Sequence, residues 1–573
     1  MDKKKLLAVA RGEKLADLVI KNAKIINVFT KDIDNGDLAV CDGYIVGIGD
    51  YQGKEEIDLL GYYLSPGFID GHVHIESSML TPNNYALAVM PRGTTAVVAD
   101  CHEIANVKGT DGIDFMLDAS KNSPLDVYMM IPSCVPSTEF ETAGADLKAK
   151  DILKYLTNDQ VLGLGEMMDY SGAMNGKQDV LEKLEAFGKL TIDGHAPEVK
   201  GKELNAYCLA GIKTDHECTT PEELLDKVKR GMYVHLREGS QTKNVRDLLK
   251  GLNPKFYQRI LFCSDDLHPR DIRRIGHIDN NINIAIENGI EPISAISMAT
   301  INIADCYNLR DIGAIAPGRK ADFVVFKSLD KIDVERVIKQ GKLIAENKKP
   351  LFLAQAVDSS KVTNTVRIDI EKIDLEYKLK SDLVNVIGLV KNNVTTKKLI
   401  EKVVLKKGIF LNEENLGLLK LCVIERHFTS GNIGKAIVKG YGLKHGAIAM
   451  TIAHDSHNLI CIGDNDSDML LAIQKINSIG GGIVLTSKGE VKEFLPLEVG
   501  GLMSLASLEY VESKLTNLEN YARGLGVSND IEDPFLQLAF LSLAVIPELK
   551  VTDLGLFDVK EFKIIPLEAG DKS

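Results

Sequence analysis

The residues of this sequence that could carry out chemistry are histidines and carboxylates near the ends of short, apolar, β-rich runs. Six of them are potential metal ligands: His72, His74, Glu166, His195, His216 and Asp265. His72 and His74 are two residues apart in a run that predicts a strand, so both side chains should point to the same side and could bind one ion together. Imidazole and carboxylate ligands suit zinc, iron and manganese.

Each of these residues also has a simpler structural explanation, because a His-x-His pair on a strand is more often structural than metal-binding. The joint pattern favours a metal site. Five of the eight expected strand ends carry a metal-competent residue, and eight of the twelve histidines lie between positions 72 and 277. We therefore expect two ions, with Glu166 bridging them and Asp265 adding a further oxygen. Two ions that flank one water generate a strong nucleophile at neutral pH.

The elements that must position these residues alternate between strand and helix. Apolar β-branched runs separated by helical segments occur at 65–76, 94–100, 127–133, 161–166, 190–195, 212–217, 233–238 and 259–266. Eight such units predict an α/β fold of the (β/α)₈ TIM-like barrel type. Catalytic groups of such barrels lie at the C-terminal ends of the strands, so the six candidate ligands should converge at one mouth.

Other segments flank the predicted barrel, as expected for 573 residues at ~100–200 residues per domain. Short strands with turn signals at Asn35-Gly36 and Asp42-Gly43, and further short strands after the barrel, predict one discontinuous β-domain built from 1–64 and 311–350. The barrel itself should span 65–310. Residues 363–573 predict a C-terminal domain of mixed α/β structure.

Composition limits the classes of partner. The formal net charge of −13 argues against a nucleic-acid or membrane-surface binder, because such surfaces are basic. The nine cysteines are scattered and form no CxxC motif, which disfavours a disulfide framework and favours the reducing cytoplasm. The first twenty residues lack the pattern of a signal peptide, and no uncharged apolar run is long enough to span a membrane.

Several motifs resemble those of the amidohydrolase superfamily: PGFIDGHVHIE (66–76), GHAP (194–197), TDHE (214–217), CSDD (263–266) and APGRKADFVVF (316–326). Many members of that superfamily bridge their metals with a carboxylated lysine on the fourth strand. Here that run is VLGLGE, ending in Glu166, and no lysine occurs between 155 and 176. This departure disfavours a urease-like or dihydroorotase-like protein.

The chain resembles the bacterial-type adenine deaminases over essentially its full length. The segments that carry this resemblance are HVHIESSM (72–79), DCHEIANVKG (100–109), GEMMDY (165–170), DGHAP (193–197), HLREGS (235–240), CSDDLHP (263–269) and IAHDSHNLICIG (452–463). The resemblance implies free adenine as substrate and two divalent ions, manganese or iron, with zinc as a third option. A hydroxide on the metals would attack C6 of adenine and release ammonia and hypoxanthine.

The expected catalytic residues are Asp265, as proton acceptor and donor, and Glu166. Candidate substrate contacts are Glu76, His102, Glu103, His235, Arg237, Glu238, Ser240 and Asp266. The group that protonates N1 of the purine stays open among Glu166, Glu76, Asp266 and Glu103. Arg237 and Glu238 equally suit an ion pair at the rim. His268 and His277, which follow the eighth strand, are expected at helix starts or on the surface.

The C-terminal motif IAHDSHNL adds a possible second site with His454, Asp455 and His457. We expect His454 and Asp455 to be exposed at a sheet edge. The motif could be a solvated turn, bind an extra metal or cover the barrel mouth; we favour covering, because a purine pocket must exclude water. The competing functions are a hydantoinase-like amidohydrolase and a non-catalytic binding protein on the same barrel. A homo-oligomer, most simply a dimer, is expected.

Overall fold

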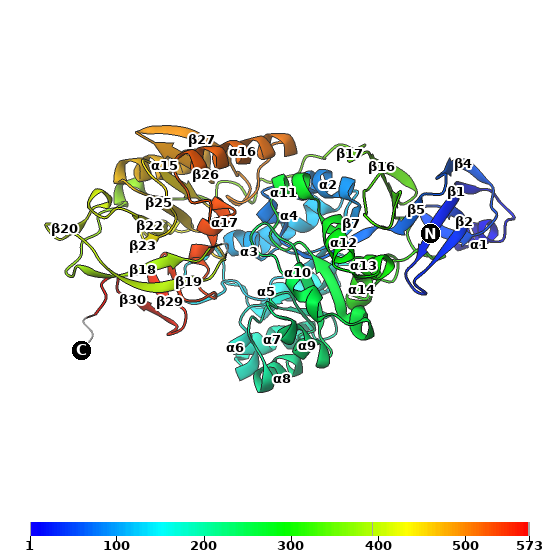
Figure 1. Cartoon of the computed structure of the whole chain (residues 1–573), viewed down its shortest axis with the longest axis horizontal. Helices are drawn as coiled ribbons and strands as arrows, with labels where there is room; N and C mark the ends of the chain where they lie inside the picture. The colour runs from blue at the N-terminus through cyan, green and yellow to red at the C-terminus, as the bar shows by residue number, and fades with distance from the viewer. Residues whose placement is uncertain (1, 392, 571–573) are drawn as a thin grey trace.

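The computed structural model describes residues 2–391 and 393–570 (Figure 1). Figure 1 shows three bodies in a row: an N-terminal β-sheet at one end, a region of parallel strands and helices in the middle, and a C-terminal sheet region at the other end. The two termini lie in opposite outer bodies. Among the described residues, no helix has both the length and the apolar character needed to cross a membrane.

The middle body contains eight strands in the order that the sequence predicts. They are β6 (Phe68–Val73), β7 (Thr94–Asp100), β8 (Asp126–Ile131), β9 (Val161–Met167), β10 (Thr191–Gly194), β11 (Thr214–Asp215), β12 (Tyr233–Arg237) and β13 (Ile260–Cys263). Strands β6 to β10 pair in sequence as one parallel sheet, and β11 to β13 as another. A parallel bridge between Val73 and Asp265 joins the end of β6 to the segment after β13. The strands thus form the curled parallel sheet of a barrel.

Burial on both faces explains the near-continuous apolar strands, since parallel sheets are covered by helices. Every residue of β6 and β7 is buried. The covering helices include α4 (Thr110–Ser120), α7 (Gln178–Phe187), α9 (Pro221–Lys229) and α12 (Ile278–Glu287). Local sequence fixes the start of α9: the Thr220 side chain accepts from the Glu223 N–H, and Pro221 occupies the first helical turn.

A nine-stranded sheet combines both flanks of the barrel, as predicted. Strands β1 (Ala16–Asn27) to β5 (Tyr63–Pro66) precede the barrel, and β14 (Phe323–Phe326) to β17 (Lys349–Pro350) follow it. The two parts meet where β5 pairs antiparallel with β14, at Ser65 and Val324. The chain therefore returns to its starting sheet after the barrel is complete.

The C-terminal region is built on an eight-stranded sheet with the order β19-β18-β23-β22-β25-β24-β26-β27. Its outer strands include β18 (Leu383–Leu389), β19 (Thr396–Lys402), β23 (Ile433–Lys439) and β26 (Gly482–Ser487). Its centre is formed by β22 (Leu418–Ile424), β25 (Leu459–Gly463) and β24 (Ala447–Met450), and α15 (Asp466–Ile479) packs against it. Helix α16 (Leu508–Gly524) contacts β27 (Glu490–Pro496) and also barrel helix α11 (Pro269–Ile275). The short helix α17 (Pro534–Ala539) lies between this sheet and the barrel helices in Figure 1.

Candidate active site

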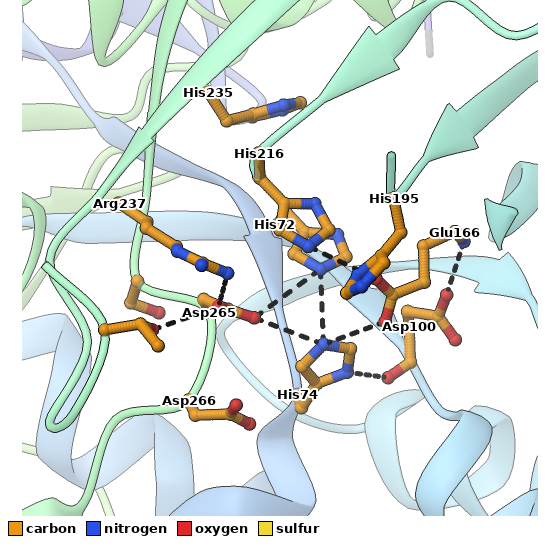
Figure 2. A network of polar contacts seen from close by, with 12 residues as sticks. His72, His74, Asp100, Glu166, His195, His216, His235, Arg237, Asp265 and Asp266 are labelled. Atoms are coloured by element: carbon orange, nitrogen blue, oxygen red, sulfur yellow. Dashed lines mark hydrogen bonds and ion pairs between the residues drawn. The ribbon is translucent and has the colours of Figure 1, made fainter. Parts of the chain in front are cut away.

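The six predicted ligands converge at the C-terminal ends of the barrel strands (Figure 2). They come from β6 and the residues just after it, from β9, and from the residues after β10, β11 and β13. All six are buried, with at most 8% of any one residue exposed. Parallel strands end at the same edge, so residues scattered over nearly two hundred positions meet in one cluster.

His74 lies at the centre of one half of this cluster. Its Nε2 atom is 3.2 Å from His72 Nε2, 3.4 Å from Glu166 Oε1 and 3.3 Å from Asp265 Oδ1. Figure 2 shows these contacts as dashed lines that meet at the ring. Two imidazole nitrogens and two carboxylate oxygens so close together suit a shared cation, because a neutral imidazole and an ionised carboxylate each offer it a lone pair.

Glu166 faces the other half with its second oxygen. Its Oε2 atom is 2.8 Å from His195 Nδ1 and 3.2 Å from His216 Nε2. Three overlapping groups of residues each place their ligand atoms close enough together to hold one ion. They are His72, His74 and Glu166; His72, His216 and Asp265; and Glu166, His195 and His216. Because the two oxygens of Glu166 face different histidines, the donor set fits a pair of ions with this carboxylate between them.

Charges around the two carboxylates keep them ionised. Burial alone would raise the pKa of Asp265, but the charge of Arg237 and the contact with His74 lower it well below the ordinary value. Burial likewise opposes ionisation of Glu166, whereas His195 and His216 lower its pKa. The site thus holds two ionised carboxylates among imidazoles, which is the charge state that divalent ions require.

Asp100, the last residue of β7, supports the cluster and was not predicted. Its Oδ2 accepts from the Glu166 N–H at 2.8 Å and its Oδ1 from the His102 N–H at 3.1 Å. His74 Nδ1 donates to the Asp100 carbonyl oxygen at 3.1 Å, which leaves the lone pair of Nε2 for the cluster. The strand-end position of Asp100 in TTAVVAD was the signal that could have identified it.

Arg237 lies inside the site and not in a rim pair with Glu238. It donates to Asp265 Oδ2 at 2.7 Å and, through Nη2, to Glu217 Oε2 at 3.0 Å. Glu217 was also missed by the sequence reasoning, although it directly follows His216. Its Oε1 atom is 3.3 Å from His216 Nε2. The pair Arg237–Glu217 therefore fixes Asp265 and His216 from one side.

A small cavity opens above the cluster, and the predicted substrate contacts divide around it. His102, Glu103, Arg237 and Asp266 line it. Ser77 Oγ donates to Glu103 Oε1 at 2.7 Å and to Asp266 Oδ1 at 2.5 Å. Asp266 therefore shares the cavity wall with Asp265, although side chains of adjacent residues in a regular strand point to opposite sides.

The other four predicted substrate contacts do not line the cavity. Glu76 accepts from the Ile104 N–H at 3.3 Å, and His235 lies deeper in the barrel, with its ring centre 6.3 Å from that of His72. Ser240 Oγ donates to Asp271 Oδ2 at 2.6 Å, and Glu238 pairs through its backbone with Lys243. Substrate contact by these four residues stays a prediction.

The C-terminal motif is buried, so the expectation of an exposed sheet edge was wrong. His454, Asp455 and His457 are 3%, 2% and 0% exposed. The reason is that the segment around α17 covers them: the ring of Phe540 stacks on His454 with centres 4.6 Å apart and an interplanar angle of 12°. His102 Nε2 lies 3.8 Å from Asp455 Oδ1, so this motif faces the barrel mouth.

His268 and His277 begin helices, as predicted, but are not on the surface. They occupy the N-cap positions of α11 and α12 and are each 2% exposed. His268 Nδ1 is 2.9 Å from Asp533 Oδ2 in the C-terminal region, and His277 Nε2 is 3.1 Å from Asp70 Oδ2 below the cluster. Both bind buried carboxylates, which explains their burial.

Two family models match the chain. The amidohydrolase family model matches residues 63–344, and that of the adenine deaminase C-terminal domain matches residues 393–563. The chain is 51% identical to an adenine deaminase of Clostridium acetobutylicum over 97% of this chain and 98% of that protein. It is 48% identical to adenine deaminase 2 of Carboxydothermus hydrogenoformans, over 98% and 99% of the two chains. It is 47% identical to adenine deaminase 2 of Desulfotalea psychrophila, over 99% of each chain.

These relatives match along nearly the whole chain, including both the barrel with its histidine–carboxylate cluster and the C-terminal sheet that covers it. The chain belongs to the adenine deaminase family of amidohydrolases.

Proposed function

We propose that this chain converts adenine and water to hypoxanthine and ammonia. The observation that carries the proposal is the position of Glu166, whose two oxygens face two different sets of histidines at the mouth of the barrel. The named activity of relatives that match over nearly the full length supports the same reaction. A hydantoinase-like activity has no comparable support.

The proposed metal ligands are the six predicted residues. His72 and His74 would hold one ion, His195 and His216 the other, with Glu166 between them and Asp265 adding an oxygen. Manganese or iron is the proposed metal, with zinc as the third option, since all three accept these ligands. Such ions, when bound, lower the pKa of a coordinated water towards neutrality and so supply the nucleophile.

The proposed proton carrier is Asp265. One of its oxygens faces His74, and the other accepts from Arg237 at 2.7 Å. The positive charge of Arg237 favours the ionised carboxylate, which can accept a proton from water and deliver it to the amine that leaves C6. For N1 of the purine, Glu103, Glu166 and Asp266 are better candidates than Glu76, because these three line the cavity and Glu76 does not.

Reconstitution of the metal-free protein tests this function. Two equivalents of Mn²⁺ or Fe²⁺ per chain should restore ammonia release from adenine and raise the temperature of unfolding, because an ion that binds only the folded state stabilises it. Dihydropyrimidines and hydantoins should give no product under the same conditions. Full activity with one equivalent, or turnover of a cyclic amide in place of adenine, would contradict the proposal.

Three further expectations stay proposals. We propose that residues 1–64 with 311–350, 65–310 and 363–573 act as the structural units. We also propose a homodimer, which sedimentation of the purified protein tests. A cytoplasmic location is consistent with nine cysteines that are all free thiols in the structure, and fractionation of cells that express the chain tests it.

A further inference from the structure

The roof of the cavity is supplied by the C-terminal region. Val394, Phe540, Leu543 and Ile546 form its apolar part, and His454 and Asp455 its polar part. The cavity volume is about 40 Å³, whereas an engineered cavity that binds benzene measures about 150 Å³. The structure is therefore closed over the cluster, and a purine enters only when the roof moves away from the barrel.

Polar atoms in this roof and in the adjacent wall lack partners. Asp455 Oδ2, His454 Nε2 and Glu103 Oε2 have no hydrogen-bond partner among the described residues, although their side chains are buried. An unpaired buried polar group destabilises the folded protein, and more so when the group is charged. Glu103, His454 and Asp455 all line the cavity, so a polar ligand bound there is a suitable partner for these atoms.

Asp455 belongs to the roof of the cavity, on the far side of the His102 ring from the cluster. The His102 Nδ1 atom is 3.3 Å from Glu166 Oε1, and its Nε2 atom is 3.8 Å from Asp455 Oδ1. Both Glu166 and Asp455 also line the cavity beside this ring. When C6 of adenine faces the cluster, the opposite edge of the purine, which carries N9–H, faces away from it and towards the roof.

We propose that Asp455 accepts a hydrogen bond from the N9–H of the free base and so excludes purines substituted at N9. The inference rests on the proposed deamination of adenine and adds its specificity. The other oxygen of Asp455 already faces His102 and His454, at 3.8 and 3.7 Å. Only Oδ2 is free for the ligand. Phe540, stacked on His454, supplies an aromatic surface beside this edge.

An extra metal ion is the alternative occupant, because ligand atoms of Glu103, His454 and His457 lie within 4.8 Å of one another. One contact argues against it. The Ala453 N–H donates to His457 Nδ1 at 3.3 Å, which leaves the proton on Nε2. A protonated ring nitrogen cannot bind a metal, so His457 would first have to lose this contact. Asp455 Oδ2, by contrast, has no hydrogen-bond partner to lose before it accepts an N–H.

The test compares adenine with an analogue of equal size that carries sulfur in place of N9–H. The wild-type holoenzyme should prefer adenine by ~10²-fold or more in kcat/KM, since sites that bind a substrate N–H strongly reject analogues without it. In Asp455→Leu, which has similar volume and no acceptor, this preference should fall at least tenfold. Asp455→Asn keeps an acceptor oxygen and should retain an intermediate preference.

Asp558→Asn is the matched control. Asp558 is equally buried in the C-terminal region but pairs with Lys398 and does not line the cavity, so its variant should keep the wild-type preference. An unchanged preference in Asp455→Leu would overturn the inference, as would a third metal equivalent that is lost in His454→Ala. If the wild type with two ions releases no ammonia from adenine, the proposed function itself fails, which is a separate outcome.

Discussion

Asp265 is held in the site by contacts on both of its carboxylate oxygens. It contacts His74 with one oxygen and Arg237 with the other, and its backbone is in the left-handed region at φ 59°. We expect Asp265→Asn to preserve the fold and to lower kcat for adenine by ~10²–10⁴-fold, because the amide cannot accept the proton from water. Steady-state kinetics with measured metal content checks this prediction.

Asp271→Asn is the control for that substitution. Asp271 follows the same strand, is buried and accepts from Ser240 Oγ, but it does not line the cavity. Its variant should keep most of the activity. Retention of more than about a tenth of the wild-type kcat in Asp265→Asn, with both ions bound, would reject the role of Asp265 as proton carrier.

Lys550 is a second residue whose environment gives a measurable prediction. It is fully buried, and its Nζ lies 2.8 Å from the carbonyl oxygens of both Val394 and Phe540, which belong to the roof. Burial lowers the pKa of Lys550 to about 7, well below ~10.4 in an unfolded chain. Between these two pKa values Lys550 is protonated in the unfolded chain and neutral in the folded protein. Its contribution to the free energy of unfolding therefore rises with pH.

The unfolding temperature of the wild type minus that of Lys550→Met should therefore increase from pH 7 to pH 10. Below pH 7 the difference should level off, because the lysine is then protonated in both states. Differential scanning calorimetry over this range is the measurement. A difference that stays constant with pH would show that Lys550 is protonated in the folded protein throughout.

The sequence predicted the convergence of the six candidate ligands better than it predicted the residues around them. An apolar run in the sequence marks where a strand ends, so His72, Glu166 and Asp265 could be assigned to the same mouth of the barrel. Asp100 and Glu217 support the cluster through other residues. Asp100 accepts from the Glu166 N–H, and Glu217 accepts from Arg237, which in turn contacts Asp265. His454 was misjudged because the residue that buries it, Phe540, is 86 positions further along the chain, and local pattern carries no information on such a contact.

At the scale of elements, the attachment of α17 to the barrel controls the roof. Asp533 caps this helix by accepting from the N–H groups of Phe535 and Leu536. The same carboxylate is 2.9 Å from His268 Nδ1 and 3.3 Å from Arg270 Nη2, both on the barrel side. One side chain thus fixes the helix start and joins it to α11, and Phe540 of the roof follows directly after α17.

The charge state of this pair depends on pH. Burial would raise the pKa of Asp533, but His268 and Arg270 lower it below the ordinary range; burial would lower the pKa of His268, but Asp533 raises it. Stability from Asp533 is present above pH ~3.9 and is lost as the pH falls towards its folded value. Stability from His268 is present below pH ~6.5 and is lost as the pH rises through its raised value.

Asp533→Asn should therefore destabilise the protein more at pH 6 than at pH 9. Breaking a buried charge pair costs about 3–5 kcal/mol, and the KM for adenine should rise because the roof is held less firmly. Asp530→Asn is the control, since Asp530 lies on the surface and pairs with the exposed Lys391. Equal destabilisation by Asp533→Asn at both pH values would show that His268 is not charged in the pair.

The strands of the barrel could be predicted because their apolar character is local, and every predicted run overlaps an observed strand. The weakest strand is β11, with only Thr214 and Asp215. Its run IKTDHE has few apolar residues, and its position between β10 and β12 was inferred from the spacing of the units. The order of the C-terminal sheet could not be predicted, because a β19-β18-β23 arrangement depends on pairings between distant segments.

At the scale of the whole molecule, the barrel and the C-terminal region share one hydrophobic core. A single cluster of buried side chains includes Ile75, Leu80 and Ile104 from the barrel and Val499 and Leu502 from the C-terminal region. Leu80 and Ser504 also pair as a parallel bridge. The C-terminal region is therefore not a cover that can be removed without exposing apolar surface of the barrel.

This shared core changes what truncation should do. If the C-terminal region only covered the barrel mouth, a chain that ends at residue 362 would keep its metals and show a raised KM for adenine or no activity. The structure instead leads us to expect that removal of 363–573 uncovers apolar residues around Ile75 and Leu80 and yields aggregated protein, since large exposed apolar patches associate. For the same reason, the intact chain should unfold its barrel and C-terminal region in one calorimetric transition. Size-exclusion chromatography of the truncated chain and calorimetry of the intact one measure these outcomes. A monodisperse truncated chain that binds two metal equivalents would show that the shared core contributes little and that the two regions fold independently.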